Sequence, residues 1–175
     1  MTRLLLLLAL FASAASTQAK DEVTTSPRGT FRIVQHYYDG SWKQVLRFAD
    51  GHTRTITLEE GISWPALYYV SPDEQWVLRV QKSGSGDNIS FLYHLDRHKQ
   101  LWRKEEQVGE IGFAYLATQP GLPRNLYHTG IEFESWDLKA GQLHFTISGS
   151  DADRSGNGIH RSLTYKLQDG SICVP

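Results

Sequence analysis

An acidic stretch near the C-terminus has the residue types and spacing of a calcium-binding loop. In DADRSGNG (151–158), the side chains of Asp151, Asp153 and Ser155 could point oxygen atoms inward, and the glycine that follows would permit a sharp turn. The bidentate glutamate expected at the twelfth loop position is replaced by Ser162. Calcium binding is therefore one hypothesis, and a solvated loop between two strands is the interpretation that we favour.

Two carboxylates lie close together in the sequence IEFESWD, where paired acids could serve glycoside hydrolysis. Glu132 and Glu134 alternate, so they share one face of a predicted strand and lie about 6.5–7 Å apart along it. Such neighbours cannot easily place one carboxylate on each side of a scissile bond. A half-exposed strand face explains the pattern better.

Other catalytic signatures are absent from the sequence. The seven histidines are scattered without a His-Glu-x-x-His motif, and there is no Gly-x-Ser-x-Gly nucleophile elbow. The glycines of SGSGDN are not followed by the lysine and helix of a phosphate-binding loop. We therefore expect a protein that is not an enzyme, with no catalytic residues and no cofactor other than the calcium ion considered above.

The five tryptophans could be core residues or stacking platforms for a ligand. Trp76 and Trp136 stand at the ends of predicted strands and are expected in the core. Trp64 lies beside Pro65 in a loop-like stretch, so it is the better candidate for an exposed side chain that binds a ligand.

Short strands separated by turn signals must position these residues. Asp-Gly pairs at 39–40 and 50–51 predict tight hairpins, because both residues tolerate a positive φ. The strands that we expect fall into three sets: 30–38, 42–49 and 53–58; 66–70, 75–81, 88–96 and 99–103; 131–137, 142–148, 161–167 and a short 171–174.

Two segments do not follow this rhythm. Residues 20–28 are polar, and we expect them to form a flexible N-terminus. Residues 104–127 begin with a stretch that fits a short helix or another strand, and they continue as a loop because of their prolines and Gly121. This second segment could cover an exposed sheet edge.

The second and third sets resemble each other. LRVQKSGSG (78–86) aligns with LHFTISGSD (143–151), and further along the chain Tyr93 aligns with Tyr165. The offset in residue number between aligned positions is different in these two stretches, and the difference corresponds to the length of one loop. This pattern indicates two related four-stranded units.

The stretch SPDEQWVLRVQ, followed by LYHLD, resembles one repeat of the TolB-type periplasmic propellers. In that family a Ser-Pro-Asp-Gly turn precedes such a strand, whereas here Glu74 replaces the glycine. The resemblance covers residues 68–97 and, more loosely, 131–172. It implies an all-β fold of antiparallel meanders stacked in a propeller-like manner, with about three incomplete blades. Propellers need about four to eight blades, so an open stack, a ring completed by a homodimer and a β-sandwich remain alternatives.

The sequence SGSGDNISFLY is also loosely similar to the Ser/Gly-rich loop of periplasmic lysozyme inhibitors, which enters the lysozyme cleft. This resemblance would give the loop at 83–88 an inhibitory role. The matching positions are Ser83, Gly84, Ser85, Gly86 and Tyr93.

The first residues have the features of a secretory signal peptide. Residues 1–19 combine an early arginine, a short apolar run and small residues at two candidate cleavage sites. We therefore expect a periplasmic or secreted protein with a single all-β domain over 29–175. Cys173 is the only cysteine, so an internal disulfide is excluded. Basic and acidic residues number 18 and 19 and are interspersed, which argues against nucleic acid as a partner and gives no support for a membrane tether.

These observations predict an exported, non-enzymatic binding domain whose loops contact a protein, peptide or glycan. An inhibitor of a lysozyme-type enzyme and a glycan-binding module are the alternatives.

Overall fold

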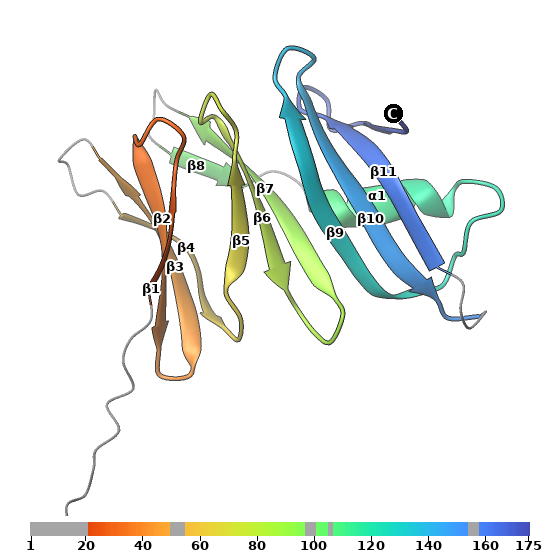
Figure 1. Ribbon diagram of the computed structural model, residues 1–175, viewed down its shortest axis with the longest axis horizontal. Coiled ribbons are helices and arrows are strands. Elements are labelled where there is room, and N and C mark those ends of the chain that lie inside the picture. The colour runs from red at the N-terminus through yellow and green to blue at the C-terminus, as the bar shows by residue number, and fades with distance from the viewer. Residues whose placement is uncertain (1–20, 50–54, 97–100, 105–106, 154–157) are drawn as a thin grey trace, which may run out of the picture.

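The computed structural model describes residues 21–49, 55–96, 101–104, 107–153 and 158–175 (Figure 1). The predicted signal peptide, 1–19, lies outside the described residues. Within the described part of the chain, no helix has the length and apolar character needed to cross a membrane.

The strands form three four-stranded antiparallel sheets, and each sheet is a meander in which consecutive strands pair. The first sheet contains β1 (Asp21–Thr25), β2 (Phe31–Tyr38), β3 (Ser41–Phe48) and β4 (Thr55–Ile62). The second contains β5 (Ala66–Val70), β6 (Trp76–Lys82), β7 (Asn88–Asp96) and β8 (Leu101–Lys104). The third contains β9 (Leu126–Asp137), β10 (Gln142–Asp151), β11 (Gly158–Lys166) and β12 (Ile172–Cys173).

The three sheets stand face to face in chain order (Figure 1), and a hydrophobic core lies between each successive pair. The predicted all-β fold of stacked antiparallel meanders is confirmed. The stack is open, because the first and third sheets lie at opposite ends of it.

The N-terminal segment differs from the prediction. Residues 20–28 were expected to be flexible, but Asp21–Thr25 form β1, which pairs with β2. Val23 lies opposite Val34, and the Asp21 carboxylate pairs with the His36 ring at 2.7 Å. DEVTT contains only one apolar residue, so its sequence carries no strand signal of its own. The first sheet therefore has four strands, one more than the three that the sequence predicted for it.

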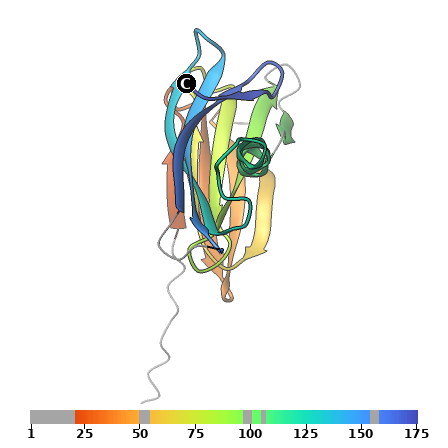
Figure 2. The ribbon, with the colours of Figure 1, turned by 90° about the vertical axis from the view of Figure 1, so that its right-hand side faces the viewer.

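The segment 104–127 contains one helix, α1 (Val108–Ala117), followed by a loop. The helix contacts β7, β10 and β12, and it buries Val108 and Leu116 in the core between the second and third sheets. It runs along the stacking direction, so it is horizontal in Figure 1 and end-on in Figure 2. The backbone N–H of Gly109 donates to Ser90 Oγ at 2.8 Å. The segment therefore packs between the facing surfaces of two sheets, and it also contacts β12, an edge strand of the third sheet.

The second and third sheets are repeats of each other, with a register that the sequence alignment misses by one residue. Tyr93 faces the first sheet and Tyr165 faces the second, so each points toward the preceding sheet. Val77 is opposite Tyr93, and Leu143 is opposite Tyr165. Val77, and not Leu78, is therefore the equivalent of Leu143.

This register makes Arg79 the equivalent of Phe145. Phe145 is in the apolar core between the second and third sheets, whereas Arg79 lies between the first and second with only 1% of its surface exposed. One guanidinium nitrogen, Nη1, donates to Glu59 Oε2 at 3.2 Å and to the Tyr93 hydroxyl at 3.3 Å. The other, Nη2, donates to Gln81 Oε1 at 3.3 Å, and among the described residues Nε has no hydrogen-bond partner.

Glutamine side chains extend this polar network across the interface. Gln35 from β2 pairs with the backbone of Ala66: its Nε2 donates to the carbonyl at 2.9 Å, and its Oε1 accepts from the N–H at 2.7 Å. Gln44 donates to Gln35 and accepts a hydrogen bond from the Tyr68 hydroxyl. Burial raises the pKa of Tyr68, so this hydroxyl stays protonated and remains a donor. The first interface is thus partly polar, and the second is apolar.

The outward face of the third sheet is polar at the positions where the second sheet is apolar. Leu78, Val80 and Leu92 of the second sheet face the third and are buried in the core. Their equivalents in the third sheet are His144, Thr146 and Thr164. Thr146 and Thr164 are buried all the same, and His144 is half-buried.

Candidate functional site

The Ser/Gly-rich loop between β6 and β7 is anchored to the beginning of β9. Asp87 Oδ1 accepts from the N–H of Thr129 at 2.8 Å. Asn88 Oδ1 accepts from the N–H of Ile131 at 2.9 Å, and its Nδ2 donates to the Ile131 carbonyl at 3.4 Å. These side chains fix the loop against the third sheet.

His128 packs against the loop at Ser85 and Gly86. The His128 Nδ1 atom lies 2.5 Å from the Ser85 carbonyl oxygen. A Cβ at Gly86 would lie 2.6 Å from the same Nδ1, and the φ of Gly86 is +86°, so the position requires glycine. Ser83, Ser85 and Gly86 are exposed and Gly84 is half-buried. The loop therefore presents its tip to solvent on a fixed base.

Trp64 lies beside this loop and is 39% exposed, as its sequence context predicts. Its carbonyl accepts from Gln81 Nε2 at 2.8 Å, which fixes the backbone. The Lys82 Nζ lies 5.3 Å from the centre of the Trp64 ring, within the range of a cation–π contact. By contrast, Trp76 and Trp136 pack against the core between the second and third sheets, as predicted.

A surface groove of about 400 Å³ reaches the Ser/Gly-rich loop at Gly86 and the Lys82 side chain that contacts Trp64. It contains Leu67, whose side chain is 60% exposed although it lies on β5. The residues that line it are Pro65, Leu67, Val80, Lys82, Gly86, Asp87 and Asn88. We call the surface made by Trp64, Leu67, Lys82, Gly86 and His128 the binding strip.

Tyr93, the remaining residue suggested by the similarity to lysozyme inhibitors, lies elsewhere. It is buried between the first and second sheets, where its hydroxyl contacts Arg79. The structure therefore brings Trp64 together with the loop at 83–86 but separates Tyr93 from it.

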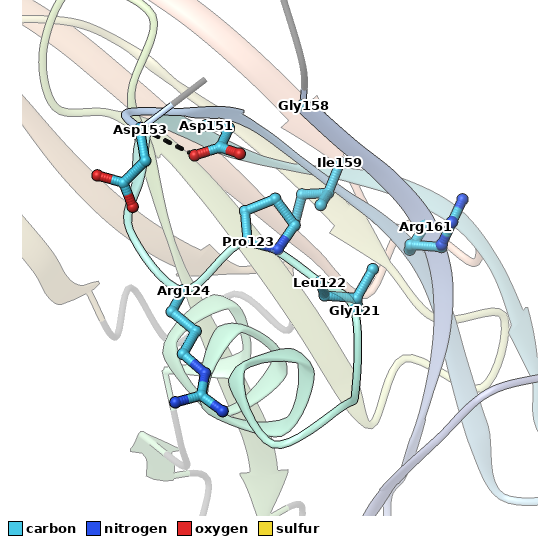
Figure 3. Close-up of a pocket in the computed structure, with 9 residues that line it drawn as sticks. All are labelled: Gly121, Leu122, Pro123, Arg124, Asp151, Asp153, Gly158, Ile159 and Arg161. Atoms are coloured by element: carbon cyan, nitrogen blue, oxygen red, sulfur yellow. Dashed lines mark hydrogen bonds between the residues drawn. The ribbon is translucent and has the colours of Figure 1, made fainter. Parts of the chain in front are cut away.

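The acidic stretch lies at the end of β10, beside a cleft of about 570 Å³ (Figure 3). Asp151 Oδ1 accepts from the backbone N–H of Asp153 at 2.9 Å, and Asn125 Nδ2 donates to Asp153 Oδ1 at 3.5 Å. In Figure 3 the Asp153 carboxylate points away from that of Asp151. Ser155 lies outside the described residues. Among the residues that the structure does describe, no three His, Cys, Asp or Glu side chains are grouped to hold a metal ion.

Glu132 and Glu134 share one face of β9, as predicted, and both are exposed. Glu134 accepts hydrogen bonds from the hydroxyls of Thr146 and Ser162. These bonds, first that from Thr146 and then that from Ser162, lower the pKa of Glu134. Its carboxylate thus serves to bind hydroxyls across three strands.

Sequence reasoning missed Leu67, Lys82 and His128. Leu67 lies within ALYYV, where a run of apolar residues gives no sign of which side chains are exposed. His128 reaches the Ser/Gly loop only because β9 lies next to β7 in space. Neither position carries a motif, so no local signal was available.

Comparison with known proteins gives similarities of fold alone. No family model matches the chain, and no curated protein matches it. TolB from Acinetobacter baumannii matches with a TM-score of 0.45 and 13% identity, over 89% of this chain and 32% of that one. A proposed 6-phosphogluconolactonase from Bacteroides uniformis matches with a TM-score of 0.39 and 14% identity, over 87% of this chain and 38% of that one. This chain thus spans about a third of either structure, and its predicted partial resemblance to TolB-type propeller repeats is confirmed.

Proposed function

We propose that this chain is an exported, non-enzymatic binding domain that holds a protein ligand on the binding strip. The observation that carries the proposal is the exposure of Leu67 in the groove and of Trp64 against Lys82, which also lines it. A strand leucine with more than half of its surface in water contributes nothing to the core, and exposed apolar groups that gather at a groove are typical of interaction sites.

The chemistry of the strip favours a protein over other ligands. Tryptophan is among the residues that contribute most to protein interfaces, and an aliphatic side chain beside it supplies apolar contact area. Lys82 adds a positive charge next to the ring. The loop that flanks the groove is anchored through Asp87 and Asn88, so binding would cost little ordering entropy.

Inhibition of a lysozyme-type enzyme is a specific form of this proposal. The exposed tip at Ser83, Ser85 and Gly86 stands on the base formed by the contacts to β9, which is the arrangement that a cleft-entering loop needs. An assay of lysozymes from several structural classes, with the protein present at micromolar concentration, tests it. Inhibition is supported if the wild-type protein lowers the activity of a lysozyme and the Gly86→Val variant does not. Unchanged activity of every lysozyme in the presence of the wild-type protein would exclude inhibition.

Export is supported by the character of residues 1–19. Fractionation of cells that express the full chain tests this part, because export predicts the protein outside the cytoplasm in a form shortened at its N-terminus.

The binding proposal is tested by affinity capture from the exported protein fraction, followed by calorimetry with the purified ligand. The double variant W64A/L67A removes the apolar part of the strip, and we expect its affinity to fall at least about tenfold. Tyr38→Ala is the matched control, because Tyr38 is an exposed aromatic residue of the first sheet. Equal affinity of W64A/L67A and the wild type would overturn the proposal.

A further inference from the structure

The cleft beside the acidic stretch is a second candidate site, and it shares no lining residue with the groove of the binding strip. It lies between the loop that follows α1 and the facing ends of β10 and β11 (Figure 3). Its volume of about 570 Å³ falls in the range of sites for small ligands. It is lined by Gly121, Leu122, Pro123, Arg124, Asp151, Asp153, Gly158, Ile159 and Arg161.

Asp151 places a negative charge in the wall of this cleft. Only 7% of its surface is exposed. Its Oδ1 accepts one backbone hydrogen bond, from Asp153. Among the residues that the structure describes, no cation lies within ion-pair distance of this carboxylate. A largely buried carboxylate without a counter-charge among the described residues is costly, and a ligand cation would supply that charge.

Two arginines flank the rim on opposite sides, as Figure 3 shows for Arg124 and Arg161. Both are exposed. In the part of the chain that the structure describes, neither has a carboxylate within ion-pair distance; the only hydrogen bond found is from Arg161 Nη1 to the carbonyl of His160, at 3.3 Å. Guanidinium groups without such a partner bind carboxylates well, because the planar fork donates two parallel hydrogen bonds.

The surface between the buried carboxylate and the arginines is apolar. Leu122, Pro123 and Ile159 supply it, and Ile159 is itself buried. The cleft therefore offers a negative charge, an apolar stretch and positive charges in succession.

We propose that this cleft binds a small zwitterion whose ammonium and carboxylate groups are separated by an apolar stem, the class of amino acids and short peptides. The ammonium pairs with Asp151, the stem lies on Leu122, Pro123 and Ile159, and the carboxylate is held by Arg124 or Arg161. Side chains as exposed as these two arginines change rotamer quickly enough to turn toward a ligand.

The test is a titration of the ¹⁵N-labelled protein at pH 7, followed by amide chemical shifts, with three small molecules of matched length. 6-Aminohexanoate carries both charges, hexylamine carries only the ammonium, and hexanoate carries only the carboxylate. We expect 6-aminohexanoate to shift the amides of Gly121, Asp151 and Ile159 and to bind about tenfold more tightly than hexylamine. Hexanoate should bind more weakly still.

Asp151→Asn is the decisive variant, because the amide oxygen can still accept the hydrogen bond from Asp153 while the charge is lost. It should weaken 6-aminohexanoate about tenfold or more. Asp169→Asn, in the exposed turn before β12, is the matched control and should leave the affinity unchanged. The proposal is overturned if 6-aminohexanoate leaves the lining amides unshifted at millimolar concentration, or if Asp151→Asn binds it as tightly as the wild type. Binding of hexylamine as tight as that of 6-aminohexanoate would overturn the role of the arginines.

Discussion

Arg79 and Phe145 occupy equivalent positions in successive sheets, so the same site holds a buried charge in one interface and a buried ring in the next. Each lies two residues after the residue that faces the equivalent tyrosine, Tyr93 or Tyr165. The interface between the second and third sheets is accordingly apolar. The one between the first and second depends on a guanidinium whose carboxylate partner, Glu59, is partly exposed.

The ion pair of Arg79 and Glu59 predicts that removing one charge lowers the free energy of unfolding more than removing the other. Glu59→Gln leaves Arg79 buried without a counter-charge, and it should lower the free energy of unfolding by about 1–3 kcal/mol. Arg79→Met removes the buried charge, including the unsatisfied Nε, and should cost less than Glu59→Gln or even stabilise the fold. Urea unfolding of both variants checks the order. If Arg79→Met proves the more damaging change, the network supplies more stability than its burial costs.

Glu74 replaces the glycine of the resembling repeats and links two sheets. It has a φ of +62° and is fully buried, and its carboxylate accepts from the N–H of Arg28 at 2.6 Å and from the Thr30 hydroxyl at 2.5 Å. Glu74→Gly relieves the strained backbone but loses both bonds, so we expect a net loss of about 1–4 kcal/mol in unfolding free energy. Asp39→Gly is the control, because Asp39 has a φ of +49° in an exposed hairpin turn. It should be neutral or slightly stabilising; a stabilising Glu74→Gly would show that the cross-sheet bonds matter little.

Gly112 lets α1 approach β10. A Cβ at this position would clash with Ile147 Cδ1 and would come within 3.4 Å of Phe145 Cε2. Gly112→Ala should therefore destabilise the protein by about 1–3 kcal/mol, although alanine favours a helix. Ile147→Val removes the clashing carbon. In a double-mutant cycle measured by thermal unfolding, Gly112→Ala should then cost at least about 1 kcal/mol less in the Ile147→Val background. If the effects of Gly112→Ala and Ile147→Val on stability simply add, the close packing of α1 against β10 is contradicted.

Glu134 predicts a pH dependence with a defined sign. Its pKa is lowered in the folded state by the hydroxyls of Thr146 and Ser162. The corresponding stability is present above the pKa of the unfolded state and is lost as pH falls through the lowered pKa. Glu134→Gln should therefore be less stable than the wild type at pH 7, and the gap should narrow as pH falls below 4. Urea unfolding at pH 7 and pH 3 measures the difference in unfolding free energy between the wild type and Glu134→Gln. An equal difference at the two pH values would contradict the prediction.

The anchoring of the Ser/Gly loop should matter for both stability and binding. Asn88→Ala removes both hydrogen bonds to Ile131, and we expect a loss of about 1–2 kcal/mol and faster hydrogen exchange at Gly86 and Asp87. Ser83→Ala is the control, because its side chain is exposed at the same loop. Unchanged exchange in Asn88→Ala would show that the loop holds its position without β9.

The positions of most strands could be predicted from the sequence, but the register of β6 and the contacts between sheets could not. The Asp39-Gly40 turn and the β-rich runs located most strands of all three sheets to within a few residues, because these signals are local. The predicted turn at 50–51 lies outside the described residues. β6 was aligned one residue out, since Val77 and Leu78 are both apolar and both buried on opposite faces. A strand covered on two sides has no alternation to fix its register. The partners of Glu74, Arg79 and Asn88 likewise lie in other sheets or strands, beyond what a linear pattern indicates.

The most direct test of the binding strip is amide shift mapping of the ¹⁵N-labelled protein with its captured ligand. We predict the largest shifts at Trp64, Leu67 and Gly86, together with the loop residues beside them. Shifts confined to the outward face of the third sheet or to the first sheet, with the strip unchanged, would contradict the proposed function.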